Sequence, residues 1–158
     1  MKKSIITLAL VFITIAAVSA QPRAIGARLT YSASVSYQHY VGDKGFIQAD
    51  LDFPWFRGIG VTGTYNWIIA QPAWTSAGSW DFYAGVGLGA GGHFFGLGYG
   101  GFGIGYAGVA GNVGLSYTFD IPLQIAIEER VILGAQFWRG YAGFYYDPWP
   151  ALAIRYSF

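Results

Sequence analysis

The sequence predicts an all-β fold, a transmembrane antiparallel up-and-down β-barrel, most simply of eight strands, that follows a cleaved signal peptide. Three observations predict it: an export-type N-terminus, too few charges for a soluble surface, and side chains that alternate with a period of two. The chain is 54% hydrophobic and 19% aromatic but only 11% charged, whereas a soluble surface carries about 25–35% charged residues. After the N-terminus it has no second long apolar run. Strands, each only half apolar, are therefore the expected way to span a bilayer.

The N-terminus has the marks of a secretory signal peptide. Lys2 and Lys3 precede an apolar run over residues 5–18, and Val18-Ser19-Ala20 is a small-x-small cleavage site. The run is shorter than the ~20 residues of a membrane helix. We expect cleavage after Ala20, which leaves residues 21–158 as one barrel domain. The chain has no cysteine, so neither a disulfide framework nor a lipid-modified cysteine is expected.

The alternation is unbroken from residue 27 to residue 39, where Leu29 and Val35 share one face and Arg28 and Ser34 the other. Successive side chains of a strand point to opposite faces, so in a membrane barrel the apolar set faces lipid and the small or polar set faces inward. The same pattern returns in six further segments: 47–53, 58–68, 80–90, 107–119, 123–131 and 152–158. Breaks between segments fall at Gly42–Gly45, Pro54, 71–79 and Asp120–Pro122. Glu129 falls on the lipid side, where a position near the interface would keep its cost small.

Glycine occupies nearly every second position from Gly85 to Gly114. A glycine-rich dinucleotide loop needs a helix after it, and no helical pattern follows here. Inward glycines instead leave room in a narrow barrel and let strands bend. At Gly100-Gly101 the bulky residues change from odd to even positions, which predicts a loop or a bulge.

Seven alternating segments leave one strand to be found, because a barrel with both ends on one side of the membrane has an even number of strands. Residues 24–41 are long enough for two short strands joined near Ser32–Ser34, and residues 133–146 are the alternative source. We prefer the first.

The segment Gly111-Asn-Val-Gly-Leu-Ser-Tyr-Thr-Phe-Asp-Ile-Pro-Leu123 and the ending Ala153-Ile-Arg-Tyr-Ser-Phe158, with the export signal and the Gly-aromatic strands, resemble small outer-membrane β-barrel proteins of Gram-negative bacteria. The resemblance covers essentially the whole mature chain. It implies a place in the bacterial outer membrane among its lipids, and recognition of Phe158 as an assembly signal by the barrel-assembly machinery. It also implies a periplasmic turn at 120–122 and surface loops around 93–103 and 134–150. Functions in this family are varied or unassigned, so no catalytic residue carries over.

The inward face holds three positive and four negative residues: Arg28, Asp50, Asp52, Asp81, Glu128, Arg130 and Arg155. An eight-stranded barrel is just wide enough for side chains to fill. A buried charge without its partner costs about 3–5 kcal/mol, so we expect a polar network that closes the lumen. A narrow passage for small solutes is the alternative.

Aromatic residues crowd the predicted last loop and form a candidate external patch, because loops carry function on rigid scaffolds. The patch is Trp138, Tyr141, Phe144, Tyr145, Tyr146 and Trp149. Tryptophans near strand ends are expected in an interfacial aromatic girdle more than in a sugar-binding surface.

The sequence offers little catalytic chemistry. His39 and His93 suggest a lipid-modifying enzyme only if a base or nucleophile lies beside one of them, and the serines near His39 fall on the opposite face. Two distant histidines without cysteine predict no metal site, and no cofactor is expected. The charges nearly balance, with nine Lys and Arg against eight Asp and Glu, and form no basic stripe, so nucleic acid is not an expected partner. We therefore expect a structural or surface-interaction role rather than an enzyme, and low charge disfavours a soluble barrel around a lipid-like ligand.

Overall fold

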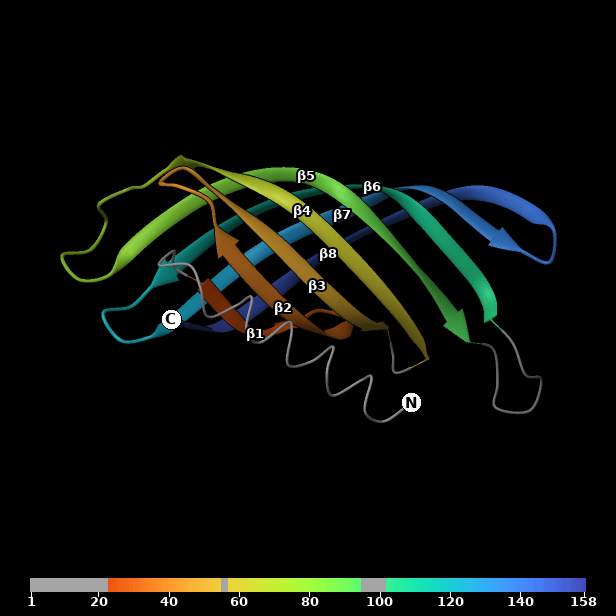
Figure 1. Ribbon diagram of the computed structural model, residues 1–158, viewed down its shortest axis with the longest axis horizontal. Helices are drawn as coiled ribbons and strands as arrows, with labels where there is room; N and C mark the ends of the chain where they lie inside the picture. Colours follow the sequence, from red (N-terminus) through yellow and green to blue (C-terminus); the bar gives the residue numbers. More distant parts are fainter. Residues whose placement is uncertain (1–22, 55–56, 95–101) are drawn as a thin grey trace, which may run out of the picture.

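The computed structural model describes residues 23–54, 57–94 and 102–158, and these residues form eight β-strands. The strands are β1 (Arg23–Leu29), β2 (Ser32–Tyr40), β3 (Gly45–Pro54), β4 (Gly58–Ala70), β5 (Ser79–Phe94), β6 (Phe102–Thr118), β7 (Leu123–Trp138) and β8 (Tyr141–Ser157). Each pairs antiparallel with the next, and β8 pairs with β1, so the sheet closes on itself (Figure 1). The prediction of an all-β, up-and-down barrel of eight strands is confirmed. The predicted signal peptide, residues 1–20, lies outside the described residues.

The described residues contain no helix long and apolar enough to cross a membrane.

The eighth strand comes from residues 24–41, the preferred of the two segments considered from the sequence. Residues 23–40 form two strands joined at Thr30 and Tyr31, slightly before the expected position, and Leu29 pairs with Ala33. Residues directly opposite in an antiparallel pair share a face, and positions 29 and 33 are both odd. The two-residue pattern therefore continues across the turn, which is why one long strand and two short ones look alike in the sequence.

The predicted turns after β2, β4 and β6 are present at one end of the barrel. Gly42 and Gly78 have φ of 67°, a left-handed conformation that glycine adopts without steric cost. The Asp120–Pro122 turn is closed by the amide of Phe119, which donates to the carbonyl of Leu123 at 2.9 Å. The C-terminus lies at this same end (Figure 1).

The predicted surface loop over residues 134–150 is wrong. These residues are paired strands of β7 and β8 out to Trp138 and Tyr141. Arg139 and Gly140, with φ of 44° and 85°, form a two-residue connection that fits a type I′ hairpin turn. Aromatic residues favour strands, so the segment continues the barrel wall. Of the other predicted loop, His93 and Phe94 belong to β5 and Phe102 to β6; residues 95–101, with the change of phase at Gly100-Gly101, lie outside the described residues.

The barrel wall is uneven in height. Strands β1–β4 have 7 to 13 residues, whereas β5–β8 have 16 or 17. The pairing of β1 with β8 ends at Leu29 and Leu152. At the end with the β1–β2 turn, the first part of β8 therefore projects beyond β1, and the long strands extend past the short ones (Figure 1). We call this end the open mouth.

The faces follow the predicted alternation. Among the described residues, the buried set contains 18 polar or charged side chains and nine hydrophobic ones, while large apolar residues such as Val61, Leu88 and Ile127 are 58%, 69% and 66% exposed on the outer face. Bulky residues also occur inside: Phe46, Tyr83, Tyr106 and Ile132 are buried. The interior is thus polar at its centre, with aromatic side chains packed around it.

Candidate functional site

Glu128 is the centre of a buried polar network. Its side chain is 0% exposed, and its two oxygens accept four hydrogen bonds. Arg155 Nη2 and the Tyr83 hydroxyl donate to Oε1, each at 2.7 Å. Arg28 Nε and Gln48 Nε2 donate to Oε2 at 3.1 and 3.2 Å. One carboxylate therefore serves two guanidinium groups, and this cluster has a net charge of +1.

A second cluster surrounds Arg130. Its Nη1 donates to Asp50 Oδ2 at 2.9 Å, and its Nη2 reaches both oxygens of Asp52 at 2.9 Å. The hydroxyls of Ser34 and Thr62 also donate to Asp52. One guanidinium group faces two carboxylates, so the net charge of this cluster is −1.

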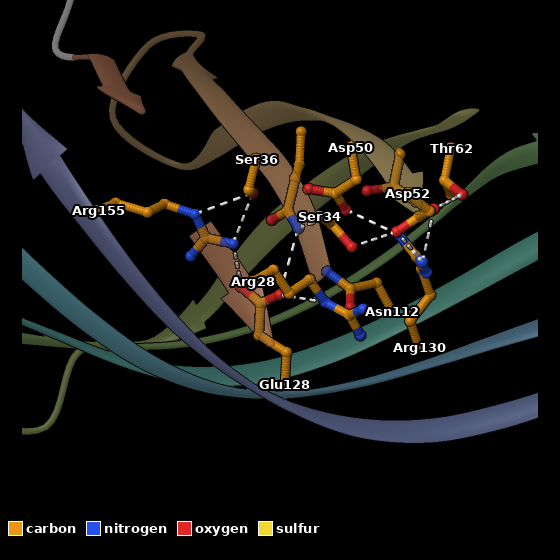
Figure 2. A network of polar contacts seen from close by, with 12 residues as sticks. Arg28, Ser34, Ser36, Asp50, Asp52, Thr62, Asn112, Glu128, Arg130 and Arg155 are labelled. Atoms are coloured by element: carbon orange, nitrogen blue, oxygen red, sulfur yellow. Dashed lines mark hydrogen bonds and ion pairs between the residues drawn. The ribbon is translucent and has the colours of Figure 1, made fainter. Parts of the chain in front are cut away.

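The amide of Gln48 joins the two clusters. The same Nε2 atom donates to Asp50 at 3.0 Å and to Glu128 at 3.2 Å. The opposite net charges of the clusters then cancel, which favours burial of ionic groups that would be costly alone. Figure 2 shows the network in one view: Arg155 with Ser36 lies on one side and Arg130 with Asp52 on the other, and Arg28 and Glu128 lie between them.

The structure brings together six of the seven inward charges that the sequence singles out, and leaves Asp81 apart. Asp81 is buried and accepts a hydrogen bond from Gln71 Nε2 at 2.7 Å. Sequence reasoning missed the neutral partners that complete the network: Ser34, Ser36, Gln38, Gln48, Thr62, Tyr83 and Gln124. All of them occupy the inward phase of their strands, which is the signal that could have found them.

Aromatic side chains lie on both sides of this network. Towards the β2–β3 turn, Phe46 packs edge-on against Tyr83 with ring centres 4.9 Å apart, and against Tyr40 at 5.2 Å. Towards the open mouth, Tyr106 stacks on Tyr145 at 4.4 Å, next to Ile132. The interior is therefore filled in layers, with rings at either side and ions between them.

The predicted aromatic patch is divided between the two faces of the β7–β8 hairpin. Phe144 and Tyr146 lie on the outer face, 73% and 57% exposed. Tyr145 and Trp149 are on the inner side, where they contact Tyr106 and Tyr31. Trp138 and Tyr141 pair at the tip of the hairpin, 48% and 74% exposed. The six residues do not form one surface, because successive side chains of a strand point in opposite directions.

Asp147 organises the inner side of the open mouth. Its Oδ2 accepts hydrogen bonds from the hydroxyls of Tyr31 at 2.9 Å and Tyr145 at 3.1 Å. Burial of the hydroxyl and the nearby Asp147 carboxylate raise the pKa of Tyr31 well above its ordinary value. Tyr31 thus stays a hydrogen-bond donor, and the acid is held in place from two sides.

The remaining residues considered from the sequence, the two histidines and Phe158, do not form a common site. His39 lies near the Tyr37 hydroxyl, 3.4 Å away, close to the β2–β3 turn. His93 lies near Tyr106 at the opposite end, with ring centres 6.0 Å apart. No group of three or more His, Cys, Asp or Glu residues suited to a metal occurs among the described residues. Phe158 is 57% exposed, and its backbone pairs with that of Arg23.

The tryptophans differ in their surroundings. Trp67 is exposed on the outer face of β4, Trp80 packs on Tyr117, and Trp74 is exposed in the connection between β4 and β5. Trp55 lies outside the described residues.

Comparison of the chain with models of known protein families found no match, and comparison with curated proteins found no similar sequence.

Proposed function

We propose that the protein is an exported outer-membrane β-barrel of the Gram-negative type, whose filled interior is structural and whose open mouth acts by surface interaction. One observation carries the proposal: the polar side chains are buried and the large apolar ones are exposed. Soluble proteins have the reverse arrangement, with charged residues almost never fully buried unless they are paired.

The outer face supports lipid as its surroundings. Exposed apolar residues come from every strand, among them Ile25 of β1, Val35 of β2, Val109 of β6 and Ile154 of β8. A soluble monomer rarely exposes a contiguous apolar patch above a few hundred Å², and this one encircles the barrel. In a bilayer the same belt meets hydrocarbon, and the pairing of β1 with β8 from Ala24 and Ser157 to Leu29 and Leu152 closes the sheet, as a spanning sheet requires.

The packing of the interior favours a structural role over a passage for solutes. Glu128, Arg155 and Tyr83 meet at its centre, and the rings of Phe46 and Tyr106 are buried on either side. A solute would have to break several charge-assisted hydrogen bonds that act together. Surface interaction at the mouth is therefore the role that the geometry favours, with Phe158 acting earlier, as the signal for assembly.

Fractionation of cells that produce the full chain tests the proposal. We expect the processed protein in the outer-membrane fraction, soluble only with detergent, and with different migration in detergent gels before and after boiling. A water-soluble barrel that stays in the periplasmic fraction without detergent would contradict it. Mass spectrometry of the N-terminus shows in the same sample whether cleavage follows Ala20.

A further inference from the structure

The described residues form a shallow pocket at the open mouth, where β8 projects beyond β1. The residues that line it include Thr30 and Tyr31 of the β1–β2 turn, Asp147 and Trp149 of β8, and Arg28 and Arg130. The enclosed part is about 10 Å³, which is the space of roughly one water molecule. A larger ligand would therefore lie across the pocket and insert one small polar group.

Two buried polar atoms of the pocket residues have no hydrogen-bond partner among the described residues: Arg28 Nη2 and Thr30 Oγ1. Arg28 as a whole is 1% exposed, and its Nε is already bound to Glu128. A buried polar group without a partner costs about 1–3 kcal/mol. A group that accepts from the guanidinium and exchanges a hydrogen bond with the threonine hydroxyl would recover that cost.

The pocket has an aromatic wall beside these polar atoms. Trp149 is 45% exposed and lies against Tyr31 with ring centres 4.5 Å apart. On the outer face this tryptophan would belong to an interfacial girdle, but it lies on the inner side and lines the same pocket as Arg28 and Arg130. A half-exposed ring next to unpartnered donors suits a ligand that has both an apolar face and hydroxyl groups.

The charges around the pocket select against an ionic ligand. Arg28 and Arg130 are balanced by Asp52 and Asp147, which also line it. An anion would meet two carboxylates and a cation two guanidinium groups, whereas hydroxyls donate to the acids and accept from the arginines.

We propose that the pocket binds a neutral saccharide ring, with one face on Trp149 and one hydroxyl inserted towards Arg28 and Thr30. The inference gives the surface-interaction role a ligand class, and it rests on the proposed function only for the side of the membrane that the mouth faces.

Saturation-transfer NMR tests the proposal with the purified full chain in a detergent that carries no sugar, such as an amine oxide. The probes are the methyl glycosides of glucose, galactose, mannose and N-acetylglucosamine, with inorganic phosphate as the anionic probe. We expect saturation of at least one glycoside. No transfer to any of the four up to their solubility limits would overturn the proposal, as would binding of phosphate alone.

Matched variants assign the site. Trp149→Ala should abolish the signal, and Thr30→Val, which keeps the shape of the side chain, should weaken binding about three- to tenfold. Trp74→Ala removes an exposed tryptophan at the opposite end and should leave binding unchanged. Heat-dependent migration in gels checks that each variant is folded. Equal binding by a folded Trp149→Ala variant would overturn the site, whatever the outcome of fractionation.

A second arm identifies the source of the sugar. The protein is placed in phosphatidylcholine vesicles with or without lipopolysaccharide, and the bound glycoside is measured again. Competition by lipopolysaccharide supports a lipid headgroup as the natural saccharide, and unchanged binding supports a free glycan. A chain that binds glycosides but fractionates as a soluble protein would overturn the membrane proposal and leave this inference standing.

Discussion

Glu128 and Glu129 are adjacent in β7 but lie on opposite faces of the barrel wall. Glu128 is 1% exposed and accepts hydrogen bonds from two arginines. Glu129 is half-buried on the outer face, between Val113 and Pro150, and forms no hydrogen bond or ion pair with any described residue. Two glutamates one residue apart thus have different environments. Substitutions at the two positions therefore separate the contribution of the interior to stability from that of the medium around the outer face.

Glu128→Gln should destabilise the barrel by about 3–5 kcal/mol, because Arg28 and Arg155 then share no carboxylate and remain buried. The measurement is equilibrium unfolding in urea from lipid vesicles. The matched control is Glu129→Gln, for which we expect a change of less than about 1 kcal/mol. Equal effects of the two variants would show that the network does not stabilise the fold.

Glu129→Leu should stabilise the protein in vesicles, by about 1 kcal/mol or more if the residue lies deep in the hydrocarbon and by less near an interface. The expected cause is removal of an unpaired carboxylate from the apolar outer face, which meets lipid in the proposed membrane placement. Comparison of vesicles with thin and thick bilayers locates the residue, because its depth changes with thickness. A loss of stability would contradict contact between this part of the outer face and lipid.

Tyr83 of β5 lies across Gly114, its register partner in β6, and a Cβ atom at Gly114 would collide with the tyrosine ring. Gly114→Ala should therefore cost about 1–3 kcal/mol through overpacking. Gly111→Ala is the matched control in the same strand, since a Cβ there meets nothing within 4 Å. Unfolding in urea compares the two, and in a Tyr83→Ala background the further cost of Gly114→Ala should largely disappear. If Gly114→Ala costs as much in the Tyr83→Ala background as in the unchanged protein, the penalty comes from the backbone rather than from the ring.

Within the seven alternating segments, the sequence alone could predict which side of the wall a residue occupies. Arg28, Asp50 and Glu128 are inward, and Leu88 and Ile127 outward, because a period of two leaves only one choice once one face is apolar. The same pattern gave seven segments and so an expected count of eight strands. It could not place the turn at Thr30 and Tyr31, because odd-numbered residues lie on the same face before and after that turn.

Pairing within the interior could not be predicted. Arg28 and Glu128 are 100 positions apart and meet only through the register of the closed sheet, which no local pattern encodes. The prediction of a loop in place of the β7–β8 hairpin is wrong for a related reason: aromatic, glycine and proline residues occur both in loops and in strands that project beyond a barrel. Because β8 projects there, Trp149 lines the pocket at the open mouth instead of belonging to the expected interfacial girdle.

The purified protein should show no steady single-channel current in planar bilayers. Three layers oppose a passage: the rings of Phe46 and Tyr83, the ion network around Glu128, and the stacked rings of Tyr106 and Tyr145. Because the layers are separate, Glu128→Gln alone should leave the interior closed although it weakens the fold. Ions should pass only when all three layers are opened, by adding Phe46→Ala, Tyr83→Ala, Tyr106→Ala and Tyr145→Ala. Steady openings of the unchanged protein would instead favour the narrow-passage hypothesis, since a filled eight-stranded interior has no room for a continuous water column.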